Sequence, residues 1–501
     1  MTTGKPKVLI ANRGEIAVRV MRTCRDLGIR TVAVYSDVDR TALHVRMADE
    51  AYLIGTAPPQ DSYLRIERIV EVAKRTKCDA VHPGYGFLSE NADFAQAVAD
   101  AGIAFVGPPA SVQRALGSKT EARKIARGAG VPLAEGSVEP LSTEPEVLAA
   151  AERIGYPVML KPAAGGGGKG MRVVRASDEL GVAWRGAVGE ATTAFGAPAL
   201  LVERFIENGR HIEVQILADD HGNVVWLGER DCSIQRRHQK LIEETPGPSV
   251  DEALRARLAD AAVRIARAAD YRNAGTCEFL VAPDGSFVFL EVNTRLQVEH
   301  PVTEMVTGLD LVALQLHVAA GEPLPLRQEE LVRRGAAIEC RITAEDPYAG
   351  FVPAGGRIER FRFAAGPGVR IDSAIAPGSF VPDEYDPLIA KVIAYGRDRS
   401  EALARMRRAL GETLIAGIST SLPFHAHVLS EADFVAGRYD TAYVAGHWPP
   451  PAIELDDHTV LAAAIAAVLE ARTHPRPQPR DGGVTPWAAA ARAAVLRGGE
   501  E

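Results

Sequence analysis

Two acidic side chains near the middle of the chain are spaced to face each other across a β-hairpin. The segment 275–300 holds two apolar, β-prone runs on either side of Asp284-Gly285. An Asp-Gly pair between such runs is a strong hairpin signal. If Asp284-Gly285 is a two-residue turn, the pairing places Glu278 directly opposite Glu291. The sequence therefore predicts a pair of opposed carboxylates.

Carboxylates placed this way need a compensating charge. Directly opposed Cβ atoms lie about 5 Å apart, and two charges at that distance repel by about 3 kcal/mol at an effective dielectric of 20. A proton, a basic side chain or a cation offsets this repulsion. Asn293 lies two residues beyond Glu291 and so points to the same face. Two carboxylates and an amide oxygen are hard ligands that Mg²⁺ takes together with substrate phosphates.

More polar residues follow the hairpin with the same alternation. Arg295, Gln297 and Glu299 fall on one side of the extended chain. The register also places Leu280 opposite Phe289, in an apolar patch at the other end of the hairpin. A surface hairpin with a solvated polar face is the alternative. The grouping of the polar residues at one end favours a binding site.

Length, composition and charge narrow the class of protein. The 501 residues suggest roughly three domains at about 150 residues each. Hydrophobic residues make up 47% and charged residues 24%, as in ordinary globular proteins. The net charge of −8 argues against nucleic acid or an anionic membrane as a partner. The five scattered cysteines form no C-x-x-C and fit reduced thiols, and no leader is visible. We expect a soluble, cytoplasmic protein.

The N-terminal pattern predicts a parallel, doubly wound sheet up to about residue 115. Residues 7–11 and 31–35 are buried strands separated by an amphipathic helix. The first turn, Asn12-Arg13-Gly14-Glu15, lacks the G-x-G-x-x-G of dinucleotide sites. A Rossmann-like scaffold without a dinucleotide is therefore favoured. The segment 82–86, which contains Tyr85, fits a ligand-facing edge and a tight structural turn equally well.

A glycine-rich loop between two strands forms the second strong signal. Strands are expected over 156–161 and 171–174, with four consecutive glycines between them. Gly165, Gly167 and Gly170 match G-x-G-x-x-G, but the loop leads into a strand instead of a helix. Such a loop makes a flap whose N–H groups can fold over phosphates, with Lys161 as a point charge. A flexible linker is the alternative.

Further strands and charged residues follow the flap. Strands over 200–205 and 210–217 carry Glu203 and an outward row of His211, Glu213 and Gln215. The basic run 229–240 is by default a solvated patch, or it delivers His238 and Lys240 to an anion. A helix over 251–270, a strand over 336–343 with Arg341, and antiparallel structure over 351–395 complete the pattern.

The expected divisions are a Rossmann-like domain over 1–115, linker helices over 116–134, a lid over 135–205, a core with a mixed C-terminal domain over 206–446, and an Ala/Pro/Arg-rich tail over 447–501.

These features together resemble the ATP-grasp superfamily, and six ordered motifs resemble the biotin carboxylase component of biotin-dependent carboxylases. The motifs are ANRGEIAVRVMR, HPGYGFLSEN, GGGGKGMRVV, ERDCSIQRRHQK, EVNTRLQVEHPVTE and ECRITAEDP, and the resemblance covers about residues 5–445. It implies an α/β and α+β ATP-grasp fold with a Rossmann-like N-terminal domain, a mobile glycine-rich lid and a mixed C-terminal domain. It also implies ATP, Mg²⁺ or Mn²⁺, bicarbonate and biotin as the reaction's components.

The resemblance assigns roles residue by residue. The ATP contacts are Lys119, Lys161, Gly167, Gly168, Glu203, Arg204, Phe205, Ile206, His211, Gln235 and His238. Glu278, Glu291 and Asn293 hold the metal that bridges the phosphates, so the two acids also contact ATP. Lys240, Arg295, Gln297 and the Val298 backbone bind bicarbonate, and Glu299 is the base that deprotonates it. Arg341 stabilises the biotin enolate with help from Arg295, and Tyr85 borders the biotin ring.

Two details qualify the resemblance. Ala164 stands where the glycine tract is expected to begin, which affects the opening of the lid more than phosphate binding. None of the seven methionines is followed by lysine, so the Ala-Met-Lys-Met site of biotin attachment is missing and biotin is expected on another chain. The expected partners are a biotin carboxyl carrier protein and a carboxyltransferase, and a homodimer is implied.

Several functions remain open from the sequence. The first is the biotin carboxylase subunit of an acetyl-CoA or propionyl-CoA carboxylase, and the second is that of a two-chain pyruvate carboxylase. A third is an ATP-grasp ligase for an amino acid or amine. Lys240, Arg295 and Glu299 argue against it, because they suit a small oxyanion and offer no ammonium site. A nucleotide-binding regulatory module is disfavoured by the presence of both Glu299 and Arg341.

Overall fold

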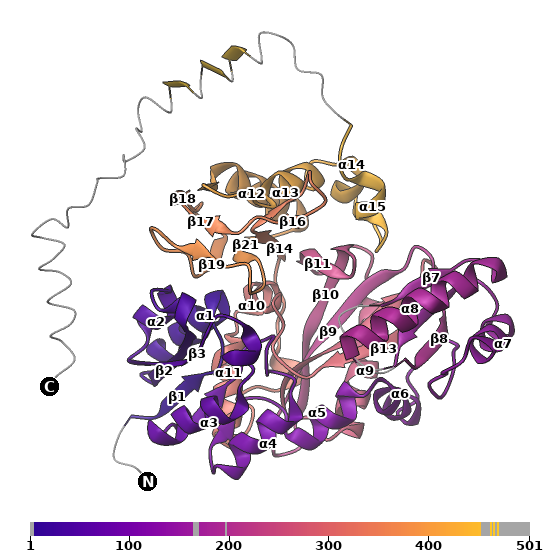
Figure 1. Cartoon of the computed structure of the whole chain (residues 1–501), viewed down its shortest axis with the longest axis horizontal. Coiled ribbons are helices and arrows are strands. Elements are labelled where there is room, and N and C mark those ends of the chain that lie inside the picture. The colour runs from indigo at the N-terminus through magenta and orange to yellow at the C-terminus, as the bar shows by residue number, and fades with distance from the viewer. Residues whose placement is uncertain are drawn as a thin grey trace, which may run out of the picture. The chain divides into compact units, whose positions relative to one another are not determined.

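The computed structural model describes residues 5–163, 170–195, 198–451 and the short stretches 461–462, 464–465 and 468–469 (Figure 1). Residues Met1–Pro449 form one unit and Pro450–Glu501 another. The Ala/Pro/Arg-rich tail expected over 447–501 falls largely outside the described residues. Within the first unit, the expected combination of a parallel N-terminal sheet with antiparallel sheets is confirmed.

A five-stranded parallel sheet opens the chain, in the order β3-β2-β1-β4-β5. The strands are β1 (Lys7–Ile10), β2 (Arg30–Ser36), β3 (Glu50–Gly55), β4 (Ala80–His82) and β5 (Ala104–Phe105), and the helices between them are α1 (Gly14–Asp26), α2 (Leu43–Met47), α3 (Ile66–Arg75) and α4 (Ala92–Asp100). Parallel strands are covered on both faces. Leu9 and Ile10 accordingly belong to two different core clusters, one on each side of β1.

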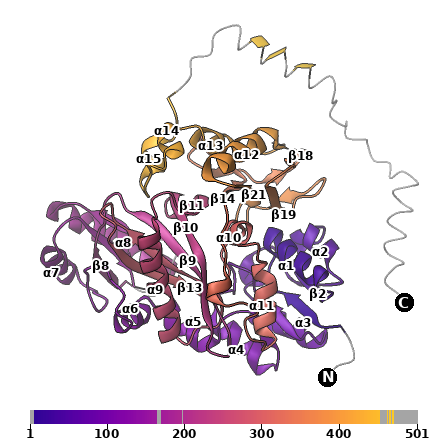
Figure 2. The same ribbon diagram turned by 180° about the vertical axis from the view of Figure 1, so that it is seen from behind.

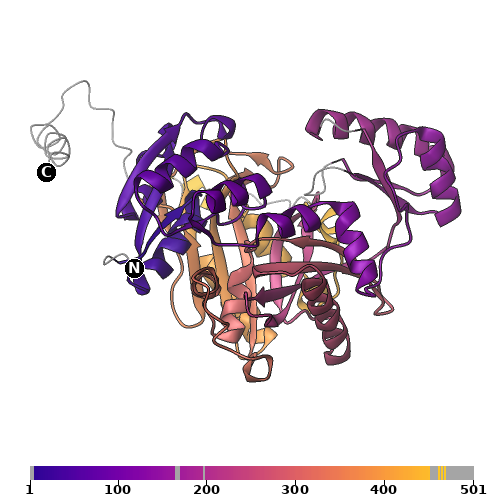
Figure 3. The ribbon, with the colours of Figure 1, turned by 90° about the horizontal axis from the view of Figure 1, so that it is seen from below.

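A small antiparallel sheet follows the helices α5 (Ala110–Gly117) and α6 (Lys119–Gly128). Its strands are β6 (Val158–Pro162), β7 (Arg172–Val174) and β8 (Leu200–Arg204), in the order β7-β6-β8. Helices α7 (Glu144–Ile154) and α8 (Leu180–Phe195) share an apolar core with this sheet (purple in Figure 3). The glycine-rich segment 164–169 lies outside the described residues, so the roles expected for Gly167 and Gly168 stay predictions.

An eight-stranded sheet with antiparallel pairing carries the acidic hairpin, in the order β13-β12-β9-β10-β11-β14-β21-β19. The strands are β9 (Arg210–Ala218), β10 (Val224–Arg236), β11 (Gln239–Thr245), β12 (Asn273–Val281), β13 (Phe287–Asn293), β14 (Ala336–Thr343), β19 (Val369–Ser373) and β21 (Leu388–Gly396). Helix α9 (Glu252–Ala268) packs on this sheet (Figure 2) and shares a core with Ile212 and Val214 of β9. Because side chains alternate along a strand, His211 and Glu213 face the other side.

The hairpin pairs Glu278 with Glu291 as predicted, but its turn is longer than expected and its register shifts along the strands. The backbone of Ala282 bonds Ser286, so the turn holds three residues and ends at Gly285, whose φ of +77° suits glycine. The predicted contact between Leu280 and Phe289 is therefore wrong, and Leu280 pairs with Val288. A register shift beyond Phe279 restores the expected pairing at the two acids.

Most of the basic run 229–240 is not a solvated patch, although residues 237–239 in the β10–β11 turn are exposed. Residues 229–236 belong to the central strand β10, where neighbours cover both edges, and Glu229 to Gln235 are all buried. The row of His211, Glu213 and Gln215 on β9 is likewise buried, although the alternation placed it outward. Arg230 and the row on β9 are buried for the same reason, because they pair with each other on one face of the sheet. Glu229 is instead buried by its pairing with Arg255 of α9.

The remaining elements of the first unit are α10 (His300–Thr307), α11 (Leu311–Ala319), β15 (Glu345–Asp346), β16 (Val352–Pro353), β17 (Gly356–Arg357), β18 (Arg360–Arg362), β20 (Phe380–Val381), α12 (Arg399–Glu412), β22 (Leu414–Ala416), α13 (Leu422–Val428), α14 (Ala432–Val435) and α15 (Tyr443–His447). Among the described residues, no single helix is long and apolar enough to cross a membrane. Only α10 and α11 taken together pass that test, and they are bent by 97°.

Candidate active site

Lys240 on β11 joins three buried carboxylates. Its Nζ lies 2.5 Å from Glu213 Oε2, 2.7 Å from Glu278 Oε1 and 2.8 Å from Glu299 Oε1. Burial alone lowers the pKa of a lysine, but these acids outweigh it and raise the pKa of Lys240 well above its ordinary value. The ammonium therefore stays charged, and it can offer a positive site to a small anion.

Glu299 lies between two cations. Its Oε1 accepts from Lys240, and its Oε2 accepts from Arg341 Nη2 at 2.8 Å. Glu299 is fully buried, and burial works against its charged form. Lys240 and Arg341 overcome that effect and hold the pKa of Glu299 well below its usual range. The carboxylate is therefore ionised and can accept a proton once its cations are engaged elsewhere.

Arg341 on β14 extends the chain of alternating charges. Its Nε donates to Glu243 Oε1 at 2.6 Å, while its Nη2 holds Glu299. Glu243 is directly opposite Glu339 on the neighbouring strand, and both are fully buried. Burial raises the pKa of Glu243 to about 7 and the pKa of Glu339 well above its usual value. Near neutral pH Glu339 therefore keeps its proton, while Glu243 is ionised only in part.

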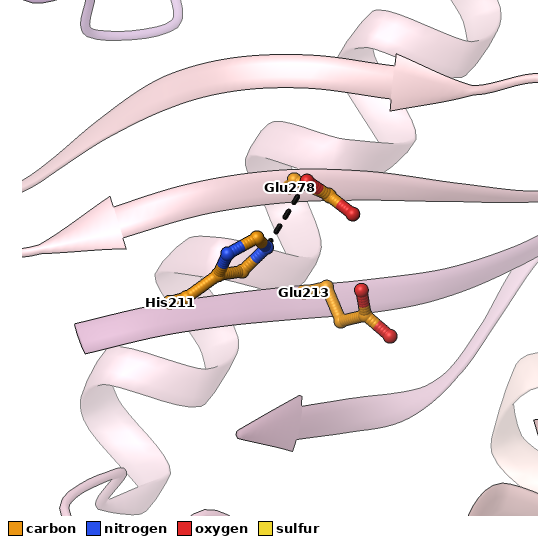
Figure 4. Close-up of side chains that lie close together, drawn as sticks. All are labelled: His211, Glu213 and Glu278. Atoms are coloured by element: carbon orange, nitrogen blue, oxygen red, sulfur yellow. Dashed lines mark ion pairs between the residues drawn. The ribbon is translucent and has the colours of Figure 1, made fainter. Parts of the chain in front are cut away.

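The end of the hairpin brings the predicted metal ligands together. Glu278 accepts from Asn293 Nδ2 at 2.8 Å and lies 3.0 Å from His211 Nε2. Figure 4 shows His211 and Glu278 pointing toward each other from adjacent strands, with Glu213 beside them. Burial opposes ionisation of Glu278, but Lys240 and His211 lower its pKa, whereas burial and the charge of Glu278 raise the pKa of Glu291.

These acids fit a divalent cation better than the neighbouring cluster does. Ligand atoms of His211, Glu213 and Glu278 lie within 4.8 Å of one another, but Glu213 already pairs with both Arg230 and Lys240, so Glu278 is the acid of that cluster that is better able to bind a metal. Glu291 has no such cation in contact among the described residues. Burial and the Glu278 charge disfavour its ionised form, and a metal between the two carboxylates would relieve both effects. The Oδ1 of Asn293 accepts a hydrogen bond from Arg295 Nη2 at 3.2 Å.

The residues after the hairpin continue the site from Asn293 to Glu299, although they are not in a strand. Arg295 Nη1 donates to Gln297 Oε1 at 2.7 Å, and its Nε bonds Glu90 at 3.0 Å. Gln297 Nε2 lies 3.3 Å from Glu278 Oε1. Arg295, Gln297 and Glu299 therefore lie on one side of this segment, as expected. Glu299 occupies the N-cap position of α10.

Three basic residues and an acid gather at the neighbouring sheet. Lys161 on β6 and Arg123 on α6 both form ion pairs with Glu203 on β8. Lys119 Nζ donates to Pro162 O at 3.0 Å, and the charges of Glu291, Lys161 and Glu203 all act on it. Burial is the main cause of the lowered pKa of Lys119. The two lysines suit phosphate groups brought near Glu291.

The other residues predicted to contact the nucleotide lie in different environments. Arg204 turns away, toward Glu135 at 3.0 Å and the end of α7. The Phe205 ring packs under Arg175, while Ile206 follows at the end of the strand. Gln235 is buried and pairs across the sheet with Lys240. His238 lies in the β10–β11 turn, where partial burial and the charges of Lys161 and His211 lower its pKa.

Tyr85 lies in the loop after β4 and contacts residues of α1 and β21. Its hydroxyl donates to Glu15 on α1, and its ring lies 5.8 Å from Lys391 Nζ. Lys391 in turn donates to Val298 O at 2.8 Å. Tyr85 is thus connected to the Glu299 loop through one intervening side chain.

Sequence reasoning missed several groups that hold this site together. Arg230 donates to Glu213, Gln215 and two threonines. Glu243 accepts from Arg341 and is paired with Glu339 on the neighbouring strand. Lys391 donates to the carbonyl oxygen of Val298. The alternation places Glu213 in one row with His211 and Gln215 but predicts no role for it. The one sequence signal for it is that Glu213 is two residues from His211, a spacing that places both on one face. The other partners come from strands distant in sequence.

Replacing Glu243 by glutamine should stabilise the protein at alkaline pH. The unfolded chain releases this proton near pH 4.5, whereas the folded protein holds it to about pH 7. Stability therefore falls as the pH rises through this window. We expect Glu243→Gln to match the parent at pH 4 and to exceed it by about 3 kcal/mol at pH 8, measured by urea unfolding.

Glu244→Gln on the same strand is the matched control. Its carboxylate bonds Arg399 at 2.6 Å and also accepts from Tyr439. Removing the carboxylate partner of this half-buried arginine should destabilise the protein at pH 8. An equal loss of stability in both variants at pH 8 would contradict the assignment of a proton to Glu243.

Three family models match the chain in succession. They are "Biotin carboxylase, N-terminal domain" over residues 5–112, "Carbamoyl-phosphate synthase L chain, ATP binding domain" over 118–327, and "Biotin carboxylase C-terminal domain" over 339–446. Together they span most of the part of the chain in which the site lies.

Individual relatives are similar over most of their length. "Biotin carboxylase 1" of Bacillus subtilis is 52% identical over 439 residues, covering 87% of this chain and 98% of that protein. A pyruvate carboxylase subunit of Methanothermobacter thermautotrophicus is 50% identical over 438 residues, covering 87% of this chain and 89% of that protein. The biotin carboxylase domain dimer of the Hydrogenobacter thermophilus 2-oxoglutarate carboxylase was solved with MgADP, ADP and bicarbonate. It is 47% identical with a TM-score of 0.86, covering 88% of this chain and 97% of that one.

Proposed function

The chain belongs to the biotin carboxylase family of ATP-dependent ligases, and we propose that it carboxylates biotin carried on another protein. The co-substrates are ATP and bicarbonate, and the metal is Mg²⁺ or Mn²⁺. The observation that carries the proposal is the hydrogen-bonded series Lys240, Glu299 and Arg341, with Glu299 fully buried at its centre, beside the opposed acids Glu278 and Glu291. This series combines an anion site, a base and a cation next to a site for metal and phosphates.

Bicarbonate binds to Lys240, Arg295, Gln297 and the backbone N–H of Val298. In the free enzyme Lys240 and Arg341 hold the pKa of Glu299 low. When bicarbonate binds to Lys240, the influence of this lysine on Glu299 weakens, so the pKa of Glu299 rises as the substrate binds. Glu299 then removes the proton from bicarbonate, and the base becomes stronger only when it is needed.

The metal, held by Glu278, Glu291 and Asn293, neutralises phosphate charge when bound. Lys119 and Lys161 contact the phosphates, and Glu203, His211, Gln235 and His238 complete the nucleotide site. Arg204, Phe205 and Ile206 contribute through the backbone, because the Arg204 side chain is engaged by Glu135. We assign Gly167 and Gly168 to the phosphates on sequence grounds.

The deprotonated bicarbonate oxygen forms a bond to the γ-phosphorus, and the bond from that phosphorus to the leaving ADP breaks. The resulting carboxyphosphate is labile in water, so exclusion of solvent protects it. It breaks at the bond between carbon and bridging oxygen to give CO₂ and phosphate. The phosphate released in this step takes the proton from the ureido nitrogen of biotin, and that nitrogen forms the N–C bond of carboxybiotin with CO₂. Arg341 stabilises the negative charge that develops on the ureido group, and Tyr85 borders the ring.

For the downstream reaction we propose an acetyl-CoA or propionyl-CoA carboxylase. Its other components would be a biotin carboxyl carrier protein and a carboxyltransferase, and the assembly of this chain would be a homodimer. The tail after residue 447 resembles the connector of acyl-CoA carboxylase α-chains. A two-chain pyruvate carboxylase is the second candidate, favoured by the similarity to the Methanothermobacter pyruvate carboxylase chain. A cytoplasmic location fits five cysteines that are all unpaired. Isolating the native complex and identifying its transferase would decide between an acyl-CoA carboxylase and a pyruvate carboxylase.

The proposed half-reaction is tested by ATP hydrolysis with the purified chain. We expect ADP formation to require bicarbonate and to be stimulated by free biotin or by biotinylated carrier, with carboxybiotin as product. ATP hydrolysis that proceeds equally without bicarbonate, or that ignores biotin, would overturn the proposal. An amino acid or amine that replaces biotin as the stimulating substrate would indicate a different ligase.

A further inference from the structure

Lys391 on β21 is a fully buried lysine outside the reaction described above. Its Nζ donates to the carbonyl oxygen of Val298 at 2.8 Å and lies 3.1 Å from Glu15 Oε1 and 3.9 Å from Asp372 Oδ2. It also lies above the ring of Tyr85. One side chain thus contacts segments from α1, the loop after β4, the loop before α10 and β19.

Burying a lysine ammonium in this position costs free energy, so the contacts that matter are those that only an ammonium can make. The ammonium loses its water and must recover hydrogen bonds from protein groups. An apolar side chain of similar size would fill the same volume without that penalty. An apolar side chain could neither pair with Glu15 and Asp372 nor donate to a backbone carbonyl. Of these contacts, the one to the Val298 carbonyl reaches the segment that leads into Glu299.

The Val298 carbonyl belongs to the peptide unit that leads into Glu299. A peptide unit is planar, so holding its oxygen fixes the rotation about the bonds that set the direction of the Glu299 side chain. A charge-assisted hydrogen bond is well suited to this, since it is shorter and stronger than a neutral one. The same constraint acts on Val298, whose N–H the proposed function assigns to bicarbonate.

The acids around Lys391 anchor it from the opposite direction. Asp372 bonds Arg370 as well, and its pKa is lowered to about 2, so it supplies a fixed negative charge. Glu15 also accepts the hydroxyl of Tyr85. Lys391 is thus held by groups from the N-terminal sheet region and from β19 while it holds the loop of Val298.

We propose that Lys391 is a positioning residue for the bicarbonate pocket, which fixes the Val298–Glu299 peptide and ties it to Tyr85 through Glu15. The inference rests on the proposed function, because it concerns the same pocket. It predicts an effect on the use of bicarbonate that differs from the effect on nucleotide binding, since no described contact joins Lys391 to Lys119, Lys161 or Glu203.

The test is Lys391→Met, which keeps the length of the side chain and removes the donor. We expect the KM for bicarbonate to rise about 10- to 100-fold, the range for loss of a hydrogen bond to a charged group. The dissociation constant for MgATP should change by less than about twofold, which is within the spread of such measurements. Glu15→Gln, which keeps a hydrogen-bonding partner for Tyr85, should shift the bicarbonate KM in the same direction by a smaller factor.

Lys7→Met is the matched control. Lys7 makes the same kind of contacts, to Glu50 at 2.7 Å and to the carbonyl of Thr76 at 2.9 Å, but within the N-terminal sheet region. It should lose stability and keep the parent KM for bicarbonate. A Lys391→Met protein that is destabilised like the control, with unchanged bicarbonate KM, overturns the proposal. If Lys391→Met does not fold, an unchanged bicarbonate KM in Glu15→Gln overturns it.

The failure of the proposed function has a different signature. In that case the parent protein itself shows no bicarbonate-dependent ATP hydrolysis, so no KM for bicarbonate exists to be shifted. A parent that depends on bicarbonate, together with a Lys391→Met variant that is unaffected, retains the proposed function and removes only the positioning role.

Discussion

Glu299→Gln should reduce bicarbonate-dependent ATP hydrolysis by about 10²- to 10⁴-fold, the range for loss of a positioned general base. Glutamine has the same shape and can still accept from Lys240 and Arg341, which both bond the Glu299 carboxylate. It cannot take a proton from bicarbonate. The affinity for MgATP should remain, because the nucleotide contacts lie on other residues. Steady-state kinetics and nucleotide titration measure the two quantities separately.

Glu229→Gln supplies the matched control for this variant. Glu229 is a buried glutamate on β10 that bonds Arg255 at 2.7 Å, and we assign it no role in the reaction. We expect its replacement to lower stability and to leave kcat near that of the parent. If Glu299→Gln keeps parental turnover, Glu299 is not the base, and the account of the pocket fails at its centre.

Lys240→Met should damage both stability and activity. The substitution leaves Glu213, Glu278 and Glu299 buried without the cation that all three contact. Removing one partner of a buried ion pair costs about 3–5 kcal/mol. Bicarbonate also loses its principal positive contact. Denaturant unfolding and bicarbonate-dependent turnover report the two effects.

The loss of stability in Lys240→Met has a specific remedy. Adding Glu213→Gln removes one of the stranded negative charges, so the double variant should recover part of the lost stability. It should not recover turnover, because Lys240 is still missing. A Lys240→Met protein as stable as the parent would show that this lysine does not neutralise the three acids.

The acidic hairpin illustrates what the sequence could and could not predict. The Asp-Gly signal and the alternation located the hairpin and paired Glu278 with Glu291. The turn is one residue longer than expected, and the register shift between Glu278 and Phe279 compensates for it. Neither feature is visible in residue types, because a β-bulge is decided by how the strand fits its neighbours. The correct pairing thus came from two deviations that cancel.

The buried charges were harder to predict for a different reason. Residues 229–240 look like a solvated run, since charged residues are rarely fully buried unless they are paired. Their partners lie on other strands: Glu213 on β9 bonds Arg230, and Glu299 before α10 bonds Lys240. A single sequence does not show which strands become neighbours. The resemblance to a family supplied roles for Lys240 and Arg341, but not the acids Glu213 and Glu243 that hold them.

The most direct test of the central claim follows oxygen atoms in a single turnover with ¹⁸O-labelled bicarbonate. If the pocket of Lys240 and Glu299 activates bicarbonate for attack on the γ-phosphate, one labelled oxygen passes into the phosphate that is released. Mass spectrometry should then detect phosphate with one ¹⁸O in proportion to the ADP formed. Phosphate that carries no label while ADP accumulates would mean that water attacks the nucleotide, and would contradict the account.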